Sequence, residues 1–111
     1  MNQNIQKNFQ SLDIRVGRII DASIFKEAKK PSYKLLIDFG EEIGIKKSSA
    51  QITNYQIEDL INKKCVAVVN LGVKQIGPYV SECLVLGSTD CKNKILLIEP
   101  SVDSMPGEKI S

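Results

Sequence analysis

The 111-residue chain contains no histidine, and this absence narrows the chemistry that it can perform. Histidine is the commonest general base and metal ligand, and without it serine and cysteine side chains lack their usual activating partner. The three cysteines, Cys65, Cys83 and Cys91, are odd in number and widely spaced, so they indicate neither a disulfide framework nor a paired metal-ligand motif. We therefore expect no catalytic residues, no metal, no cofactor and no enzyme activity, with Cys65 and Cys83 packed as thiols in apolar runs.

Long hydrophobic runs are also missing. No apolar segment is long enough to cross a bilayer, and residues 1–7 lack the charged-then-apolar order of a secretory signal. These features predict a cytoplasmic protein without membrane insertion. At 42% hydrophobic residues the chain can close one core, and no repeat or internal boundary divides it, so we expect a single domain over residues 1–111.

The alternation of apolar and polar residues predicts an all-β fold. It is clearest at residues 33–39, where Tyr33, Leu35, Ile37 and Phe39 share the inward face. Strand-like runs also occupy residues 13–24, 43–52 and 64–71, followed by the pair 83–86 and 95–98. A short helix, capped by Asn54 and ending near residue 62, separates the third run from the fourth. This order is typical of a five-stranded oligonucleotide-binding (OB-fold) barrel with an additional N-terminal helix.

The first strand-like run, residues 13–24, is long and carries a glycine in its middle. We expect Ile14, Val16, Ile20, Ala22 and Ile24 to share its apolar face. A bulge or sharp coil at Gly17 would let the strand serve both halves of the barrel. Residues 25–32 and 72–81 are then predicted to be the two loops beside the ligand face of the fold.

Basic residues gather in the first of these loops. The formal net charge of the whole chain is only +2, yet residues 26–34 contain four lysines and one glutamate, a net charge of +3. Lysines suit phosphate groups and carry no sequence information, whereas small polar side chains reach sugar hydroxyls or base edges. Candidate RNA-binding residues from this reasoning are Lys29, Lys30, Lys34, Lys46, Lys47, Lys74, Ser48, Ser49, Gln51, Asn70, Gln75 and Ser81.

Aromatic residues are scarce, with three tyrosines and three phenylalanines. Proteins that bind single strands normally stack bases on exposed rings, and here only Phe25 and Tyr79 lie in the predicted binding loops. We therefore expect recognition of a folded RNA through phosphates and hydroxyls.

Both termini carry apolar residues that need a partner surface. In residues 1–12, Ile5, Phe9 and Leu12 lie on one face of a short amphipathic helix. The helix covers either the open end of its own barrel or a second subunit. The tail, residues 99–111, has turn-forming residues and one late apolar residue, Ile110, and it either wraps along the surface or reaches that subunit. Ile5, Phe9 and Ile110 are thus the candidate dimer contacts.

Several motifs resemble those of the stand-alone tRNA-binding domain proteins, and residues 48–53 resemble the CsaA group of secretion-related chaperones. The motifs run in the family's order and are DIRVG at 13–17, IKKSSAQIT at 45–53, EDLINK at 58–63, VVNL at 68–71 and SECLVLG at 81–87. The resemblance implies a homodimeric OB-fold barrel that binds tRNA without catalysis. It also implies that Asn70, Ser81 and Glu82 face the RNA, with Lys74 and Gln75 in the loop between.

A resemblance to the CsaA group also implies an alternative function. Such a protein would bind apolar segments of unfolded preproteins and assist the secretion machinery. The candidate peptide-binding residues are Phe25, Tyr79 and Val80, in an apolar groove at the dimer seam. Polyanion binding and apolar binding can coexist on one barrel, so both functions stay open at this point.

Overall fold

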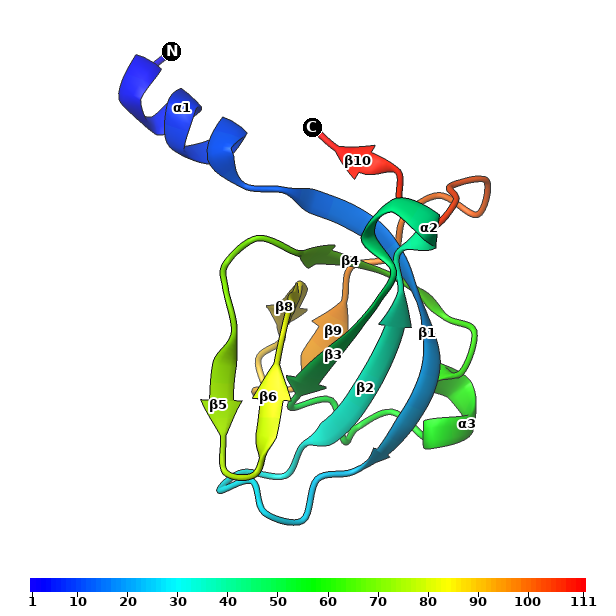
Figure 1. Cartoon of the computed structure of the whole chain (residues 1–111). Coiled ribbons are helices and arrows are strands. Elements are labelled where there is room, and N and C mark those ends of the chain that lie inside the picture. The colour runs from blue at the N-terminus through cyan, green and yellow to red at the C-terminus, as the bar shows by residue number, and fades with distance from the viewer.

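The computed structural model describes all 111 residues, with strands curled into a barrel and helices at its ends (Figure 1). The helices are α1 (Gln3–Ser11), α2 (Gly40–Ile43) and α3 (Ile57–Leu60). The strands are β1 (Ile14–Ile24), β2 (Tyr33–Asp38), β3 (Ile45–Ala50), β4 (Lys64–Val68), β5 (Lys74–Ile76), β6 (Tyr79–Ser81), β7 (Leu84–Val85), β8 (Gly87–Thr89), β9 (Ile95–Leu97) and β10 (Lys109–Ile110). None of the helices has the length and apolar character that a membrane crossing requires.

The main sheet has the strand order β3-β2-β1-β4-β7, and all its pairings are antiparallel. Its five strands curl into a nearly closed barrel, which confirms the predicted OB fold with a short helix between the third and fourth strands. Two predicted loops contain additional hairpins. Residues 72–81 form the β5–β6 hairpin, and the connection after residue 86 contains β8, which pairs with β9.

Strand β1 serves both halves of the barrel because it is irregular in the middle. Its first half pairs with β4 and its second half with β2, and the register shifts between Ile19 and Asp21. A bulge of this kind reverses which side chains point inward. Ile19 and Ala22 are therefore both buried although they are three residues apart, and Ile20 is only half-buried. Ile24 lies opposite buried Tyr33, in phase with Ala22, but it is 63% exposed at the end of the strand. The predictions that Ile20 shares the inward face and that the bulge lies at Gly17 were wrong.

Gly17 has a different function, because it lets β1 approach β2 and Phe39 closely. A Cβ atom at this position would lie 2.6 Å from Cγ2 of Ile37 and 2.7 Å from Cε1 of Phe39. Both neighbours are fully buried core side chains with no room to move. Close packing of β1 against Ile37 and Phe39 thus requires a glycine at position 17, the last residue of the DIRVG motif.

The main core lies inside the barrel and combines the inward faces of β1, β2 and β4 with Phe39 and Ile52. Four consecutive β4 residues, 65–68, are buried, as expected for a strand covered on both faces. Helix α3 inserts fully buried Leu60 into this core. The prediction that Asn54 caps α3 was wrong. The N-cap residue is Gln56, and the Asn54 side-chain amide instead donates to the Ile95 carbonyl at 3.2 Å.

The barrel closes where β3 meets the segment that precedes β7. The Glu82 backbone N–H donates to the Lys47 carbonyl at 2.7 Å, and the Lys47 N–H donates to Oε1 of Glu82 at 2.9 Å. Next to this pair, Ser48 Oγ donates to the Cys83 carbonyl at 3.0 Å. We call these bonds the closure seam. They satisfy backbone groups at the open edge of β3 that would otherwise be free to pair with another chain.

Helix α1 extends away from the barrel (Figure 1). Asn2 caps it by accepting from the N–H groups of Asn4 and Ile5, and no α1 residue is buried. The alternative in which α1 covers the open end of its own barrel was therefore wrong.

The C-terminal tail wraps along the surface, which was one of its two predicted arrangements. Lys64 Nζ donates to the carbonyls of Val102 and Ser104, both at 2.6 Å. Arg15 donates to the Gly107 carbonyl at 2.9 Å, and β10 pairs with the start of β1. The Arg15 guanidinium donates from Nε to Oδ1 of Asp13 at 2.6 Å, and this hydrogen bond raises the Arg15 pKa. The guanidinium, which is charged at any ordinary pH, also holds the tail through the Gly107 carbonyl.

We expect Gly17→Ala to destabilise the fold by about 1–3 kcal/mol, because the added methyl group overpacks the core at Ile37 and Phe39. Urea unfolding followed by circular dichroism measures the change. Ser23→Ala, at an exposed position of the same strand, is the control and should stay within about 0.5 kcal/mol of the parent protein. Equal stability of both variants would show that β1 can move away from β2 at no cost.

Candidate functional site

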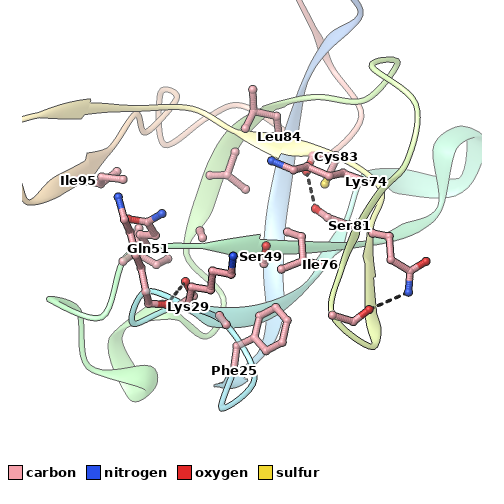
Figure 2. Close-up of a pocket in the computed structure, with 18 of the residues that line it drawn as sticks. Phe25, Lys29, Ser49, Gln51, Lys74, Ile76, Ser81, Cys83, Leu84 and Ile95 are labelled. Carbon is pink, nitrogen blue, oxygen red and sulfur yellow. Dashed lines mark hydrogen bonds between the residues drawn. The ribbon is translucent and has the colours of Figure 1, made fainter.

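A cavity of about 1100 Å³ opens between the loop 25–32 and the β5–β6 hairpin (Figure 2). Residues 49–52, at the end of β3 and just beyond it, form another side, and residues of β7 and β9 line it as well. Twelve of its 23 lining residues are hydrophobic. The sequence-predicted RNA-binding residues that line this cavity are Lys29, Lys30, Ser49, Gln51, Lys74, Gln75 and Ser81.

The two loops meet at the tip of the β5–β6 hairpin. Gly77, at the turn, has a positive φ of 56°, and a Cβ atom there would lie 3.8 Å from Cβ of Glu27. The Gln75 side chain donates to the Gly77 carbonyl at 2.8 Å and braces the turn. Because Gly77 tolerates this backbone conformation at no steric cost, the hairpin can close one side of the cavity.

The lysines at the cavity carry uncompensated charge. The chain forms two salt bridges, Arg15–Asp13 and Lys63–Glu99, and neither involves a lysine of the site. Lys29, Lys30 and Lys74 line the cavity together with a single acidic residue, Glu27. Positive charge in a concave surface attracts anions more strongly than the same charge on a convex surface. The cavity is therefore suited to a ligand that carries negative charge.

Two further predicted lysines lie against an aromatic pair formed by Phe25, which lines the cavity, and Tyr79 of β6. Phe25 and Tyr79 contact each other edge to face, with ring centroids 5.4 Å apart. Lys34 Nζ lies 5.3 Å from the Phe25 centroid and 5.4 Å from the Tyr79 centroid, and Lys47 Nζ lies 5.5 Å from the Tyr79 centroid. Cation–π attraction holds these ammonium groups beside the cavity. Lys34 and Lys47 thus extend the positive surface onto the sheet.

Tyr79 also anchors the hairpin to the barrel. Its hydroxyl donates to the Leu35 carbonyl of β2 at 3.2 Å. Burial raises the Tyr79 pKa, so the hydroxyl keeps its proton and the hydrogen bond at neutral pH. The ring is only half-buried. Val80, the neighbouring candidate peptide contact, is half-buried on β6.

Some predicted ligand residues are used inside the protein instead. Ser48 is fully buried, and its hydroxyl belongs to the closure seam, so its assignment to RNA was wrong. Phe25 is 3% exposed, so it supports the cavity wall and offers almost no surface to a peptide, in contrast to its predicted function. Ser81 lines the cavity, but its hydroxyl donates to the Cys83 carbonyl at 3.3 Å.

Three other predicted residues lie outside the cavity. Asn70 connects the end of α1 to β1, because its side chain accepts from the Asp13 N–H at 2.8 Å and donates to the Ser11 carbonyl at 2.8 Å. The Glu82 carboxylate accepts from the Lys47 N–H in the closure seam. Lys46 lies opposite Ile37 in the β2–β3 register and is half-buried. The structure therefore gives Asn70 and Glu82 connecting roles within the fold.

The cysteines offer no nucleophile to the cavity. Burial raises the pKa of Cys83 to about 11 and that of Cys65 to about 12, so both remain protonated thiols at neutral pH. This confirms that they are packed thiols. No group of three or more histidine, cysteine or acidic side chains is arranged to hold a metal ion.

Sequence reasoning missed the hydrophobic wall of the cavity. Its residues include Ile76, Leu84, Val85, Ile95 and Leu97, which come from β5, β7 and β9. Their apolar character predicted strands but gave no sign that these side chains remain partly exposed. Leu71 and Val73, in the connection before β5, are exposed as well. Their apolar character alone did not predict this exposure.

Comparison with known proteins identifies the class to which this barrel belongs. The family described as "Putative tRNA binding domain" matches residues 14–109. The chain therefore belongs to the tRNA-binding domain family, and the family resemblance predicted from its motifs is confirmed.

Within this class, the chain is similar to CsaA proteins over their whole length. It shares 52% identity with the CsaA chaperone protein from Picrophilus torridus, with a TM-score of 0.92 over 96% of this chain and 97% of that one. The chaperone CsaA from Bacillus anthracis shares 44% identity, with a TM-score of 0.90 over 100% and 99% of the two chains.

The chain is also similar to part of methionine–tRNA ligases. It is 35% identical to the enzyme from Protochlamydia amoebophila over 106 residues and 31% identical to that from Methanococcoides burtonii over 100 residues. These matches cover 95% and 90% of this chain, respectively. The chain spans only 14% of the length of each ligase.

Proposed function

We propose that this protein is a non-catalytic, cytoplasmic tRNA-binding protein of the CsaA type, which holds the RNA backbone on the lysines around the cavity. The observation that carries the proposal is the grouping of Lys29, Lys30 and Lys74 at one cavity without a salt bridge, in a chain of the tRNA-binding domain family. Lys34 and Lys47 extend the same surface across Phe25 and Tyr79. Ser49, Gln51 and Gln75 supply polar groups beside these lysines.

Phosphate contacts account for most of the affinity in this proposal. Each lysine that neutralises a phosphate releases condensed counterions, so binding weakens steeply as salt concentration rises. A near-neutral body with one positive surface also orients the approaching RNA.

We further propose that the protein forms a homodimer through the end of the barrel that carries α1. Ile5 and Phe9 are 66% and 51% exposed on one face of α1, although a helix with such an apolar face is normally covered. Ile110 of β10 pairs with Ile14 of β1 and packs beside the same end of the barrel. Figure 1 shows α1 and the C-terminus at one end and the loop 25–32 at the other. A dimer through α1 would leave both cavities open and would place two positive surfaces on one particle.

A second candidate function is that of a chaperone for unfolded preproteins, assisting the secretion machinery. It is favoured by the hydrophobic wall of the cavity and by exposed Leu71, Val73 and Leu84 around it. The similar solved structures from two organisms are themselves described as CsaA chaperones. In this reading an apolar segment of the client lies against the cavity wall, with Tyr79 and Val80 at its edge.

Charge reversal tests the tRNA proposal. The triple variant Lys29→Glu, Lys30→Glu, Lys74→Glu should bind total tRNA at least about tenfold more weakly, and its salt dependence should decrease by roughly one ion per lost phosphate contact. Filter binding at several salt concentrations measures both quantities. Arg18→Glu, Lys92→Glu, Lys109→Glu changes the net charge equally at positions outside the cavity. If the two triple variants lose affinity equally, only the overall charge matters and the proposed site is wrong.

Disruption of the apolar face of α1 tests the dimer. The parent protein should sediment at twice the 12.3 kDa chain mass, and Ile5→Asp with Phe9→Asp should sediment as a monomer. The barrel should keep its circular dichroism spectrum, because no α1 residue is buried. Gln3→Asp with Gln10→Asp adds the same charge on the opposite helix face and should remain dimeric. A parent protein that sediments at 12.3 kDa would contradict the proposal.

Suppression of aggregation tests the chaperone function. The parent protein should keep a chemically unfolded client in solution, and this protection should persist at high salt, because apolar contacts are not screened. Leu71→Ser with Leu84→Ser should remove the protection, whereas Ile24→Ser with Ile45→Ser, at exposed positions outside the cavity, should retain it. Light scattering records the outcome, and aggregation at every ratio of protein to client would eliminate this function.

A further inference from the structure

The interior of the cavity has a different chemistry from the lysines that line its mouth. Figure 2 shows the side chains of Ile76, Leu84 and Ile95 around the space into which Lys29 and Lys74 also reach. Phosphate groups gain nothing from an aliphatic wall, because a charged group loses its hydration there without compensation. A ligand that fills the whole cavity therefore needs apolar surface inside and negative charge at the mouth.

The cavity also contains polar groups that are free to bind a ligand. Ser49 and Gln51 line it beside the apolar wall, and neither makes a hydrogen bond with the other residues drawn in Figure 2. Their hydroxyl and amide groups both donate and accept hydrogen bonds. The ligand should thus present mixed donors and acceptors along one edge of an otherwise apolar group.

An unpaired nucleotide combines these three properties. Its base has apolar faces and a polar edge, and its phosphate carries the charge. Proteins that take up an unpaired base hold it between aromatic or aliphatic side chains and read its edge by hydrogen bonds. A base within a duplex has its edge already paired and its faces stacked, so it offers neither surface to the cavity.

We propose that the cavity takes up unpaired nucleotides of the bound RNA, with bases against the aliphatic wall and phosphates on Lys29, Lys30 and Lys74. This proposal rests on the proposed RNA-binding function and names the part of the RNA that enters the site. The aliphatic wall serves in place of exposed aromatic rings, because Phe25, the aromatic residue that lines the cavity, is 3% exposed. At about 1100 Å³ the cavity lies slightly above the size range of small-ligand sites, so a base fits inside it.

Charge complementarity favours RNA over a polypeptide as the occupant. Three lysines and one glutamate line the cavity. Every nucleotide of an RNA strand supplies an anionic group next to its base, whereas an apolar polypeptide segment supplies none at a regular spacing. A nucleotide strand can therefore place a phosphate beside the lysines for each base that lies against the apolar wall.

The experiment compares two single-stranded RNAs of equal length and charge, one with bases and one made entirely of abasic nucleotides. The base-bearing strand should bind at least about fivefold more tightly, the lower end of the range known for base stacking on proteins. Leu84→Ser should reduce this ratio toward one. Ile45→Ser is the matched control and should keep it, since Ile45 is similarly exposed, at 57% against 51% for Leu84, but lies outside the cavity. Fluorescence anisotropy at low salt measures the six affinities of the three proteins for the two strands, with total tRNA as the reference ligand.

The outcomes separate this proposal from the function on which it rests. Equal affinity for the two strands, with tRNA binding retained, would overturn nucleotide uptake and leave tRNA binding intact. If the parent protein binds neither strand and no tRNA, then nucleotide uptake and tRNA binding are both overturned. If bases make no difference and a reduced and alkylated unfolded protein binds in a manner that depends on Leu84, then the cavity is a polypeptide site and the proposal is wrong.

Discussion

Closure of the barrel between β3 and residues 82–83 is the constraint on which the rest of the structure depends. The sheet order ends at β3 and β7, and the closure seam joins these two ends through backbone and side-chain bonds of Lys47, Ser48 and Glu82. Because the β5–β6 hairpin directly precedes residue 82, the same bonds position the hairpin. The hairpin lies against the loop 25–32, and both segments line the cavity.

The seam also explains why small and polar residues follow Ile45 in β3. Lys47 and Ser48 of this strand use their polar groups to bond across the seam to residues 82 and 83. Ser48 is the clearest case, because it is fully buried and yet polar, and the Cys83 carbonyl satisfies its hydroxyl. Beyond the seam, Ser49 and Gln51 face the cavity. One short polar stretch thus contributes to both closure and the candidate site.

The molecule has two ends with different properties. At one end the tail and β10 are held to the body through Arg15 and Lys64, and α1 exposes apolar side chains. At the other end, Tyr79 ties the hairpin to β2 and lies beneath Lys34 and Lys47. Assembly and ligand binding are therefore proposed at separate surfaces, and neither needs the other to be rearranged.

The class of fold could be read from the amino-acid sequence, since strand periodicity, one short helix and the placement of loops are local properties. Alternation in residues 33–39 correctly placed Tyr33, Leu35, Ile37 and Phe39 inside, and the family motifs were recognisable without coordinates. The amino-acid sequence also placed Lys29, Lys30 and Lys74 in loops at the ligand face of the fold, and all three line the cavity.

How those local elements are used depends on long-range contacts in the folded chain. The shift between Ile19 and Asp21 buries Ile19 in place of Ile20, because a change of register along the strand changes which side chains point inward, and no pattern within β1 encodes it. Ser48 and Phe25 resemble ligand contacts in the sequence, yet long-range bonds and packing bury both. The apolar wall behind the lysines was equally hidden, because whether Leu84 or Ile95 is covered depends on which distant segment lies over it. Exposure is a property of the assembled chain, and the sequence specifies it only through the fold.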